Sequence, residues 1–307
     1  MNPRNLAAFS CGLLALCTGG SAYAQAWVGA PNSLSVSVGY NFAPSSAIIE
    51  TDGQQLDDVP TTHQSFQLGA EYVTPIPGLA VSASVPLLAV QFNGDPGDGA
   101  FLTPHGRYDD GDLHFVLQDF RLGARYAILE DPIALAVQVG ASIPSHGYET
   151  QGFAAAGRGL TRGHFGLSVG RFLDPILPNL YFHARYDFTL SERYKTDSAA
   201  TSDINQNYSD ISAMVGYFII PDLEVNIGTD IRITHGGLNF LEWEDNATAV
   251  QHFHDSLLNE NVFLIGGGAS YRILDNLAVY ALARVFVGGT NTRNAHIFGG
   301  GLTLDVF

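Results

Sequence analysis

The sequence is poor in cysteine and in basic residues. Its 307 residues include two cysteines, Cys11 and Cys17, a single lysine, Lys195, and 14 basic residues in all against 30 acidic ones. Because a nucleic-acid-binding protein needs a basic surface for the phosphates, this balance excludes nucleic acid as a partner. Charged residues make up only 14% of the chain and hydrophobic residues 46%, so the sequence is also too apolar to be disordered.

Both cysteines lie in a segment that is organised as a secretory signal peptide. Arg4 supplies a positive charge, an apolar stretch follows, and an A-x-A motif ends at Ala24. A lipoprotein signal on Cys17 is the alternative, but a leucine precedes that cysteine where a small residue is expected. We therefore predict a signal peptide at 1–24 and an exported chain at 25–307 that has no cysteine and forms no disulfide.

The sequence also lacks an apolar run suited to a membrane-spanning helix. Such a helix needs about 20 consecutive apolar residues. The charge-free run at 72–94 is long enough, but Pro75, Pro77 and Pro86 interrupt it. Helical membrane spans are therefore not expected.

Apolar residues instead alternate with small or polar ones through most of the chain. Near the start of this pattern, Leu34, Val36 and Val38 alternate with serines. A period of two places the apolar set on one face of a β-strand and the small or polar set on the other face. Short connections between such strands are expected at 74–78, 130–132, 174–179, 221–222 and 275–276. Longer polar connections are expected at 43–62, 93–112, 145–161, 190–208, 235–260 and 288–294.

Short and long connections alternate, and together they join twelve strands. This pattern is typical of bacterial outer-membrane barrels, which have an even number of antiparallel strands, short periplasmic turns and long extracellular loops. We therefore predict an all-β fold, a transmembrane antiparallel β-barrel of 12 strands at 25–307, located in the outer membrane of a Gram-negative cell with both termini periplasmic. A soluble β-sandwich is the alternative, but its second face would be strongly polar because it meets water.

Aromatic residues gather near the ends of the expected strands. In a barrel they would form girdles at the two membrane interfaces. The candidates are Tyr40, Phe42, Tyr72, Phe92, Tyr126, Phe172, Tyr181, Phe188, Tyr217 and Tyr271.

If the more apolar face of each strand contacts lipid, a set of charged residues points into the lumen of the barrel. The set comprises Glu71, Asp119, Arg121, Arg125, His183, Arg185, Asp187, Glu224, Asp230, Arg232, Arg272 and Arg284. A charge facing lipid costs about 2–4 kcal/mol near the midplane of the membrane. Inward placement of the charged residues is therefore expected whether or not the lumen transports a solute. The set could line a polar conduit or fill a small barrel by mutual pairing. Its interleaved signs favour pairing as the main role and leave open whether a path remains.

Histidines and acidic residues concentrate in the long loops. His252, His254 and Asp255 combine two imidazoles with a carboxylate, and such groups can bind zinc, copper or nickel. A metal site at these residues is a hypothesis, because polar loops also collect polar residues and the spacing matches no zinc signature. Loop imidazoles could equally respond to pH. No cofactor is predicted.

The sequence offers no catalytic motif. It has no G-x-S-x-G motif, and Ser145 and His146 are neighbours that would point to opposite faces of a strand. The glycine runs at 266–268 and 299–301 fall in expected strands and match no phosphate-binding loop, so they more plausibly mark bends or close approaches. An enzyme is therefore not expected.

Two neighbouring segments carry a resemblance to a known family. Residues 118–126, QDFRLGARY, fit the pattern D-x-R-x-G-x-R-Y, and residues 140–148, GASIPSHGY, fit G-x-x-x-P-[ST]-x-x-Y. In these motifs the chain resembles the outer-membrane transporter family associated with the meta-pathway of phenol degradation. The resemblance spans most of the barrel and is strongest over 111–148. It implies an outer-membrane channel for small molecules, including hydrophobic or aromatic compounds.

The sequence thus predicts an outer-membrane channel or transporter for small molecules. The alternative is a non-transporting barrel that acts as a surface-binding protein or as the membrane partner of a larger complex. The expected partners are outer-membrane lipid, lipopolysaccharide and a small-molecule solute, and a monomer is favoured over an oligomer.

Overall fold

The structure is a computed structural model that describes residues 26–94, 106–194, 203–239 and 256–306. The expected signal peptide at 1–24 lies outside these residues. No helix in the described ranges is long and apolar enough to cross a membrane.

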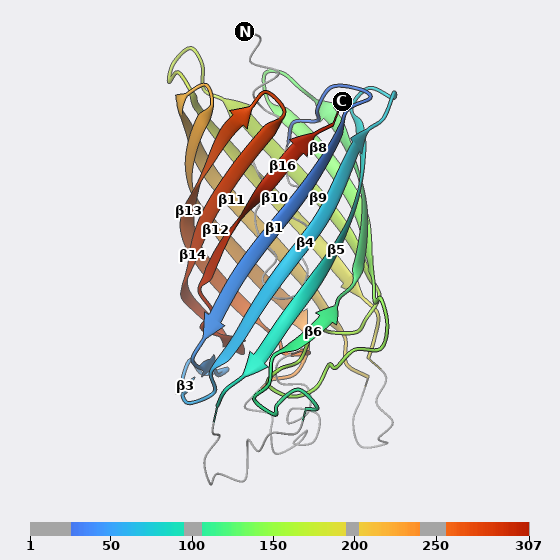
Figure 1. Ribbon diagram of the computed structural model, residues 1–307, viewed down its shortest axis with the longest axis vertical. Helices are drawn as coiled ribbons and strands as arrows, with labels where there is room; N and C mark the ends of the chain where they lie inside the picture. The colour runs from blue at the N-terminus through green and yellow to red at the C-terminus, as the bar shows by residue number, and fades with distance from the viewer. Residues whose placement is uncertain (1–25, 95–105, 195–202, 240–255, 307) are drawn as a thin grey trace.

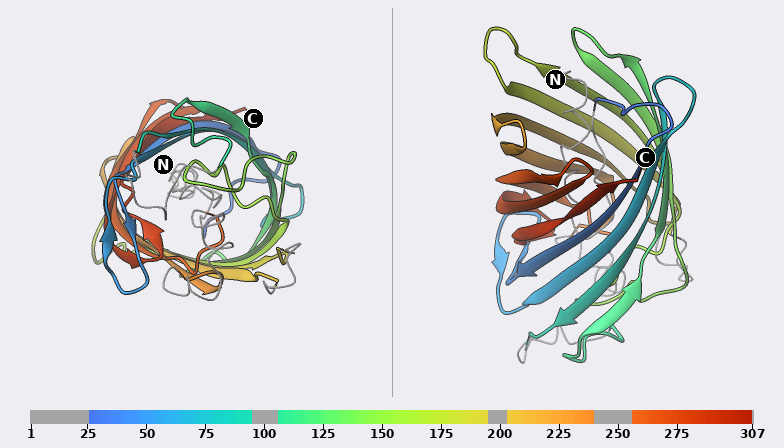
Figure 2. Two further views of the ribbon diagram at one scale, coloured as in Figure 1. Left: turned by 90° about the horizontal axis from the view of Figure 1, so that it is seen from below. Right: turned by 45° about the horizontal axis from the view of Figure 1, so that its top comes forward.

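Twelve antiparallel strands close into a barrel, as the sequence predicts (Figures 1 and 2). The first barrel strand pairs with the second on one side and with the last on the other, so that Val38 lies opposite both Leu68 and Leu302. The barrel strands are β1 (Leu34–Ser45), β4 (Thr61–Val73), β5 (Leu79–Phe92), β6 (His114–Leu117) continued by β7 (Phe120–Leu129), β8 (Ala134–Ile143), β9 (Arg162–Phe172), β10 (Leu180–Ser191), β11 (Gln206–Ile220), β12 (Leu223–Gly236), β13 (Asn261–Leu274), β14 (Leu277–Thr290) and β16 (Ile297–Asp305).

The two ends of the barrel differ. The first and last described residues and the short connections lie at one end, which we call the turn end, and the described parts of the long connections lie at the other, which we call the loop end (Figure 1). At the loop end, β15 (Thr292–Arg293), β2 (Ile48–Ile49) and β3 (Gln55–Leu56) form a small separate sheet. These three strands fall in segments that the sequence analysis treated as loops.

The outer surface of the barrel is apolar on every strand. Leu68, Leu122 and Ile227, for example, expose 53%, 55% and 62% of their surface. Monomeric soluble proteins rarely expose contiguous apolar patches of more than a few hundred Å². A soluble sandwich would have buried this face against a second sheet. The alternating apolar residues therefore form a surface suited to lipid.

The expected aromatic girdle is correct only in part. Tyr126, Tyr217 and Tyr271 lie on the outer surface and are 43–48% exposed. Phe92 and Tyr181, in contrast, are each 1% exposed and lie inside the barrel, so their assignment to a membrane interface is wrong. Each belongs to the inward-facing set of its strand, and proximity to a strand end does not distinguish the two faces.

The fourth barrel strand contains a bulge between β6 and β7. Leu87 of β5 pairs with Leu117, and Ser84 pairs with Arg121, so β6 and β7 contain one more residue than β5 over this interval. Pro86 lies opposite the bulge and has no N–H to donate to a ladder, which favours such an interruption. As a result, the two consecutive residues of the bulge, Gln118 and Asp119, are both buried inside the barrel.

The glycine run of β16 lies where the barrel closes. Gly301 pairs with Gly39 of β1, and a β-carbon at either position would lie 2.7 Å from the hydroxyl oxygen of Tyr280. Glycine is therefore required for the Tyr280 ring to lie against this wall. The run marks a close approach, as expected, and not a ligand loop.

Candidate functional site

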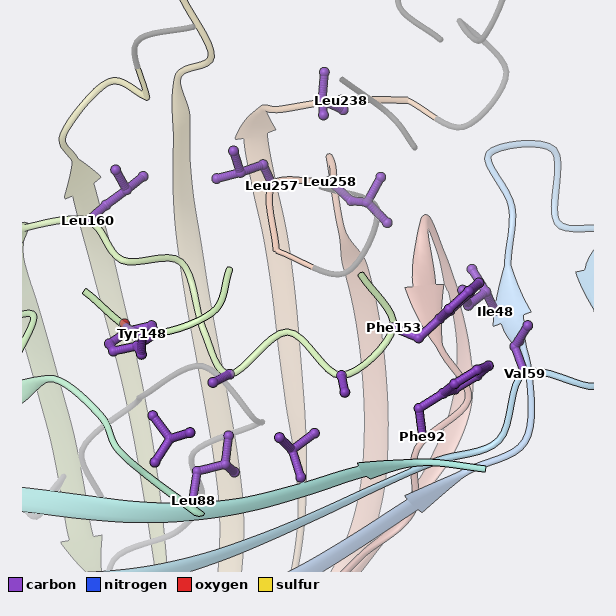
Figure 3. Packing of buried hydrophobic residues seen from close by; sticks show 14 of the residues in the cluster. Ile48, Val59, Leu88, Phe92, Tyr148, Phe153, Leu160, Leu238, Leu257 and Leu258 are labelled. Carbon is purple, nitrogen blue, oxygen red and sulfur yellow. The ribbon is translucent and has the colours of Figure 1, made fainter. Parts of the chain in front are cut away.

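An apolar core occupies the loop end of the barrel. The connection between β8 and β9, residues 144–161, folds into this end and contributes Tyr148, Phe153 and Leu160 (Figures 2 and 3). The Phe153 ring stacks on Phe92 of β5 with 4.5 Å between centroids. The remaining members of the core are Ile48, Val59, Leu88, Val90, Val116, Ala154, Ala156, Ile204, Leu238, Leu257 and Leu258.

Polar contacts hold this connection in place. The Asp109 carboxylate accepts hydrogen bonds from the backbone N–H groups of Phe153 at 3.2 Å and Ala154 at 2.8 Å. Arg158 donates from Nε to the backbone oxygen of Ser256 at 3.2 Å. Burial lowers the pKa of the Arg158 guanidinium to about 10, so it still carries its charge at neutral pH. Residues 144–161 are therefore held inside the loop end by packing and by hydrogen bonds.

Between this core and the turn end, the lumen is lined by buried charges, most of which form ion pairs. Arg125 of β7 lies 2.7 Å from Glu71 of β4. Arg284 of β14 lies 2.9 Å from Asp230 of β12, and Arg284 itself has no exposed surface. Pairs of this kind neutralise charges that burial alone would make costly.

Other members of the expected charged set pair within or next to their own strand. Arg185 and Asp187, two residues apart on β10, form an ion pair. Arg272 near the end of β13 lies 3.7 Å from Asp222 in the adjacent short turn.

Glu224 and His183 lie near the turn end beside aromatic rings. Glu224 accepts a hydrogen bond from the hydroxyl of Tyr181. His183 packs against Trp27, whose ring centroid is 6.3 Å away, and Trp27 also contacts Tyr181 at 5.9 Å. The first described residues of the chain therefore reach into the lumen at the turn end.

Several residues that contact the charged set in the lumen were not predicted from the sequence. Asp119 pairs with Arg162, the first residue of β9, and Arg232 lies 2.7 Å from Asp210 of β11. Tyr208 lies between two guanidinium groups, since the Arg232 and Arg158 carbons are 4.5 and 4.7 Å from its ring centroid.

A detectable signal existed for only some of these partners. Asp210 lies beyond the expected loop at 190–208 and shares the inward parity of β11 with Ser212, so period two could have revealed it. Arg162 directly follows a segment taken as a loop. Arg158, and Glu260 at 3.5 Å from it, lie within expected loops, where period two gives no information.

The described part of the lumen contains two small cavities against β4, β5 and their neighbours. The larger, of about 50 Å³, is lined by Glu71, Arg121, Arg125, Gln138, His164, Arg185 and Asp187 together with small residues. The smaller, of about 20 Å³, is lined by Asn41, His63, Ser65, Gln67, Gln118 and Arg121 together with apolar residues. Arg121 borders both.

The hypothetical metal site cannot be placed. His252, His254 and Asp255 lie outside the described residues. Within the described ranges, no group of three or more histidine, cysteine, aspartate or glutamate residues is arranged to hold a metal ion.

Comparison with known proteins identifies the architecture. No protein-family model matches the chain, and no curated protein sequence is significantly similar to it. The chain is similar in structure to the COG4313 outer membrane channel from Pseudomonas putida F1, with a TM-score of 0.70, 12% identity, and coverage of 94% of this chain and 99% of that one. The fold is that of an outer-membrane β-barrel.

Two further solved structures are less similar. The transport unit of the autotransporter AIDA-I from Escherichia coli has a TM-score of 0.49 and 11% identity, with coverage of 99% of this chain and 96% of that one. The TodX deltaS2S3 mutant monoaromatic hydrocarbon channel has a TM-score of 0.44 and 11% identity, with coverage of 90% and 91%. At these scores they add nothing to the fold assignment.

Proposed function

We propose that this protein is an outer-membrane channel for small molecules. The observation that carries the proposal is a closed barrel with an apolar outer surface and a polar, charged lumen that contains cavities. An apolar outer surface is stable in contact with lipid. A polar, charged lumen can hold water and admit polar solutes. Similarity of fold to an outer membrane channel supports the same function.

The proposal includes export and a defined orientation. The signal peptide at 1–24 directs the chain across the inner membrane and is cleaved after Ala24. The turn end, which carries both termini, faces the periplasm, and the loop end faces the lipopolysaccharide layer, where its acidic residues bind divalent cations. We expect a monomer.

The charges of the lumen are proposed to select among solutes. Interleaved ion pairs keep the path polar without giving it a large net charge, which favours small polar or amphipathic molecules. Small aromatic compounds are included, as the motifs at 118–126 and 140–148 imply through their family resemblance to transporters linked to phenol degradation.

A specific observation favours a second candidate, a barrel that does not transport. The apolar core occupies the loop end of the lumen, which suits a surface-binding protein or the membrane partner of a larger complex. In that case the charged lumen would serve stability alone.

Reconstitution separates the two candidates. We expect purified protein to conduct ions in planar bilayers and to admit small solutes into liposomes. Absence of both conductance and flux over a broad solute panel would exclude the channel and leave the second candidate.

A further inference from the structure

Arg121 differs from the other buried arginines of the lumen because no described residue forms an ion pair with it. It is 5% exposed, and among the described residues neither its Nε nor its Nη1 has a hydrogen-bond acceptor. No ion pair of Arg121 occurs in the described part of the chain. The buried arginines at 125, 158, 162, 232 and 284 each have a carboxylate within 3.5 Å.

The nearest carboxylate along the strand, Asp119, makes no hydrogen bond or ion pair with Arg121 and is engaged by other groups. Both oxygens of Asp119 accept hydrogen bonds, one from the hydroxyl of Tyr148 and the other from Arg162. A buried guanidinium without acceptors is costly, so a group that binds there gains strength from its desolvated surroundings.

The surroundings of Arg121 leave space for a ligand. Its neighbours across the two adjacent strands are Ser84 of β5 and Ser142 of β8, both small. Arg121 lines both lumen cavities, and the larger, about 50 Å³, has room for about three to four water molecules or a group of that size. In the smaller cavity, Gln67 adds a second buried donor, Nε2, that has no acceptor among the described residues.

The charge around the larger cavity selects the ligand. Arg125 is neutralised by Glu71 and Arg185 by Asp187, so Arg121 leaves one unbalanced positive charge. A single negative charge balances it, whereas the two carboxylates lining the cavity repel a dianion. The planar fork of a guanidinium matches a carboxylate with two parallel hydrogen bonds.

We propose that Arg121 is an anion-binding site inside the lumen and that its ligand is a small organic monocarboxylate. The inference rests on the proposed channel function, to which it adds a class of solute. Solutes of this class would pause at Arg121 and supply the hydrogen-bond acceptors that the described residues do not provide.

Binding to purified protein in detergent micelles tests this site without requiring passage. Sodium acetate is titrated by calorimetry at an ionic strength held constant with sodium chloride. We expect wild type to bind acetate and Arg121→Gln to bind it about tenfold more weakly or worse, the loss expected for one charged hydrogen bond. Arg121→Lys keeps the charge but loses the fork, so its affinity should also fall. Arg171→Gln, an exposed site on β9, is the matched control and should bind as wild type does.

The outcomes separate this inference from the channel proposal. No acetate binding by wild type, or equal binding by wild type and Arg121→Gln, overturns the inference even if the protein conducts. Tighter binding of inorganic phosphate than of acetate overturns the carboxylate assignment. Arg121-dependent acetate binding by a protein that does not conduct supports the site and refutes the channel. Should both Arg121 variants fail to fold, a higher melting temperature of wild type in acetate than in chloride supports the proposal, and equal melting temperatures overturn it.

Discussion

Replacing Phe153 by alanine should open the loop end of the barrel. The Phe153 side chain is 0% exposed and stacks on Phe92, so it anchors residues 144–161 in the apolar core. Truncating a buried phenylalanine to alanine costs about 3–5 kcal/mol. If residues 144–161 leave the lumen as a unit, the substitution destabilises only the state in which they occupy it. The open fraction then rises by about 100-fold or more, since 1.4 kcal/mol corresponds to a factor of ten.

Two assays follow this opening, and one of them does not depend on transport. Trypsin should cleave Phe153→Ala after Arg158, which is 3% exposed in the closed barrel, much faster than it cleaves wild type. Single-channel recordings should show a higher open probability. Phe115→Ala is the matched control, because Phe115 is 64% exposed on the outer surface. Equal cleavage rates and open probabilities for the two variants would refute the reasoning that the core holds the connection in place.

Three further predictions concern the barrel wall and the loops. Arg284→Met leaves Asp230 buried without its partner and should lower the free energy of unfolding by about 3–5 kcal/mol in liposome refolding experiments. Adding Asp230→Asn should restore much of this loss. An unchanged stability of Arg284→Met would show that the pair contributes little. Leu122→Arg places a charge against lipid and should lower the free energy of unfolding by about 2–4 kcal/mol in the same experiment. Ile176→Arg is the control and should lower it little, because Ile176 is 83% exposed in a turn. Similar losses at both sites would argue against lipid contact at Leu122. The hydrogen bond to His114 lowers the pKa of the Asp110 carboxyl, so the carboxylate that accepts this bond should persist until pH falls through that lowered pKa. Carboxyl carbon NMR should show a higher pKa in His114→Ala, and no change would assign the shift to other groups.

The strand pattern of this sequence predicts the barrel because one physical demand repeats on every strand. Residues such as Val38 and Leu302 must face lipid, and this demand produces an alternation that is visible without knowledge of the neighbouring strands. The small sheet of β2, β3 and β15 was missed because strands of two residues are too short to show a period.

The inward set was easier to predict than its partners. Arg125 and Glu71 were both expected in the lumen, but their pairing depends on side chains that cross β5 from β4 to β7. Which arginine stays unpaired could not be foreseen. The partner of Asp119 is Arg162, which directly follows an expected loop, where period two gives no information.

The closure of the barrel between β1 and β16 joins the first and last strands that the chain supplies. At its middle, Gly39, Tyr40 and Asn41 face Gly301, Gly300 and Gly299, so few side chains interlock across this line. Glycine within a strand weakens it because it fixes more backbone freedom and packs less surface. Few side chains therefore reinforce the backbone hydrogen bonds of the β1–β16 line, so unzipping under force or heat should be able to begin there. Insertion into the membrane should also end there, because this line can form only after all the other strands are in place.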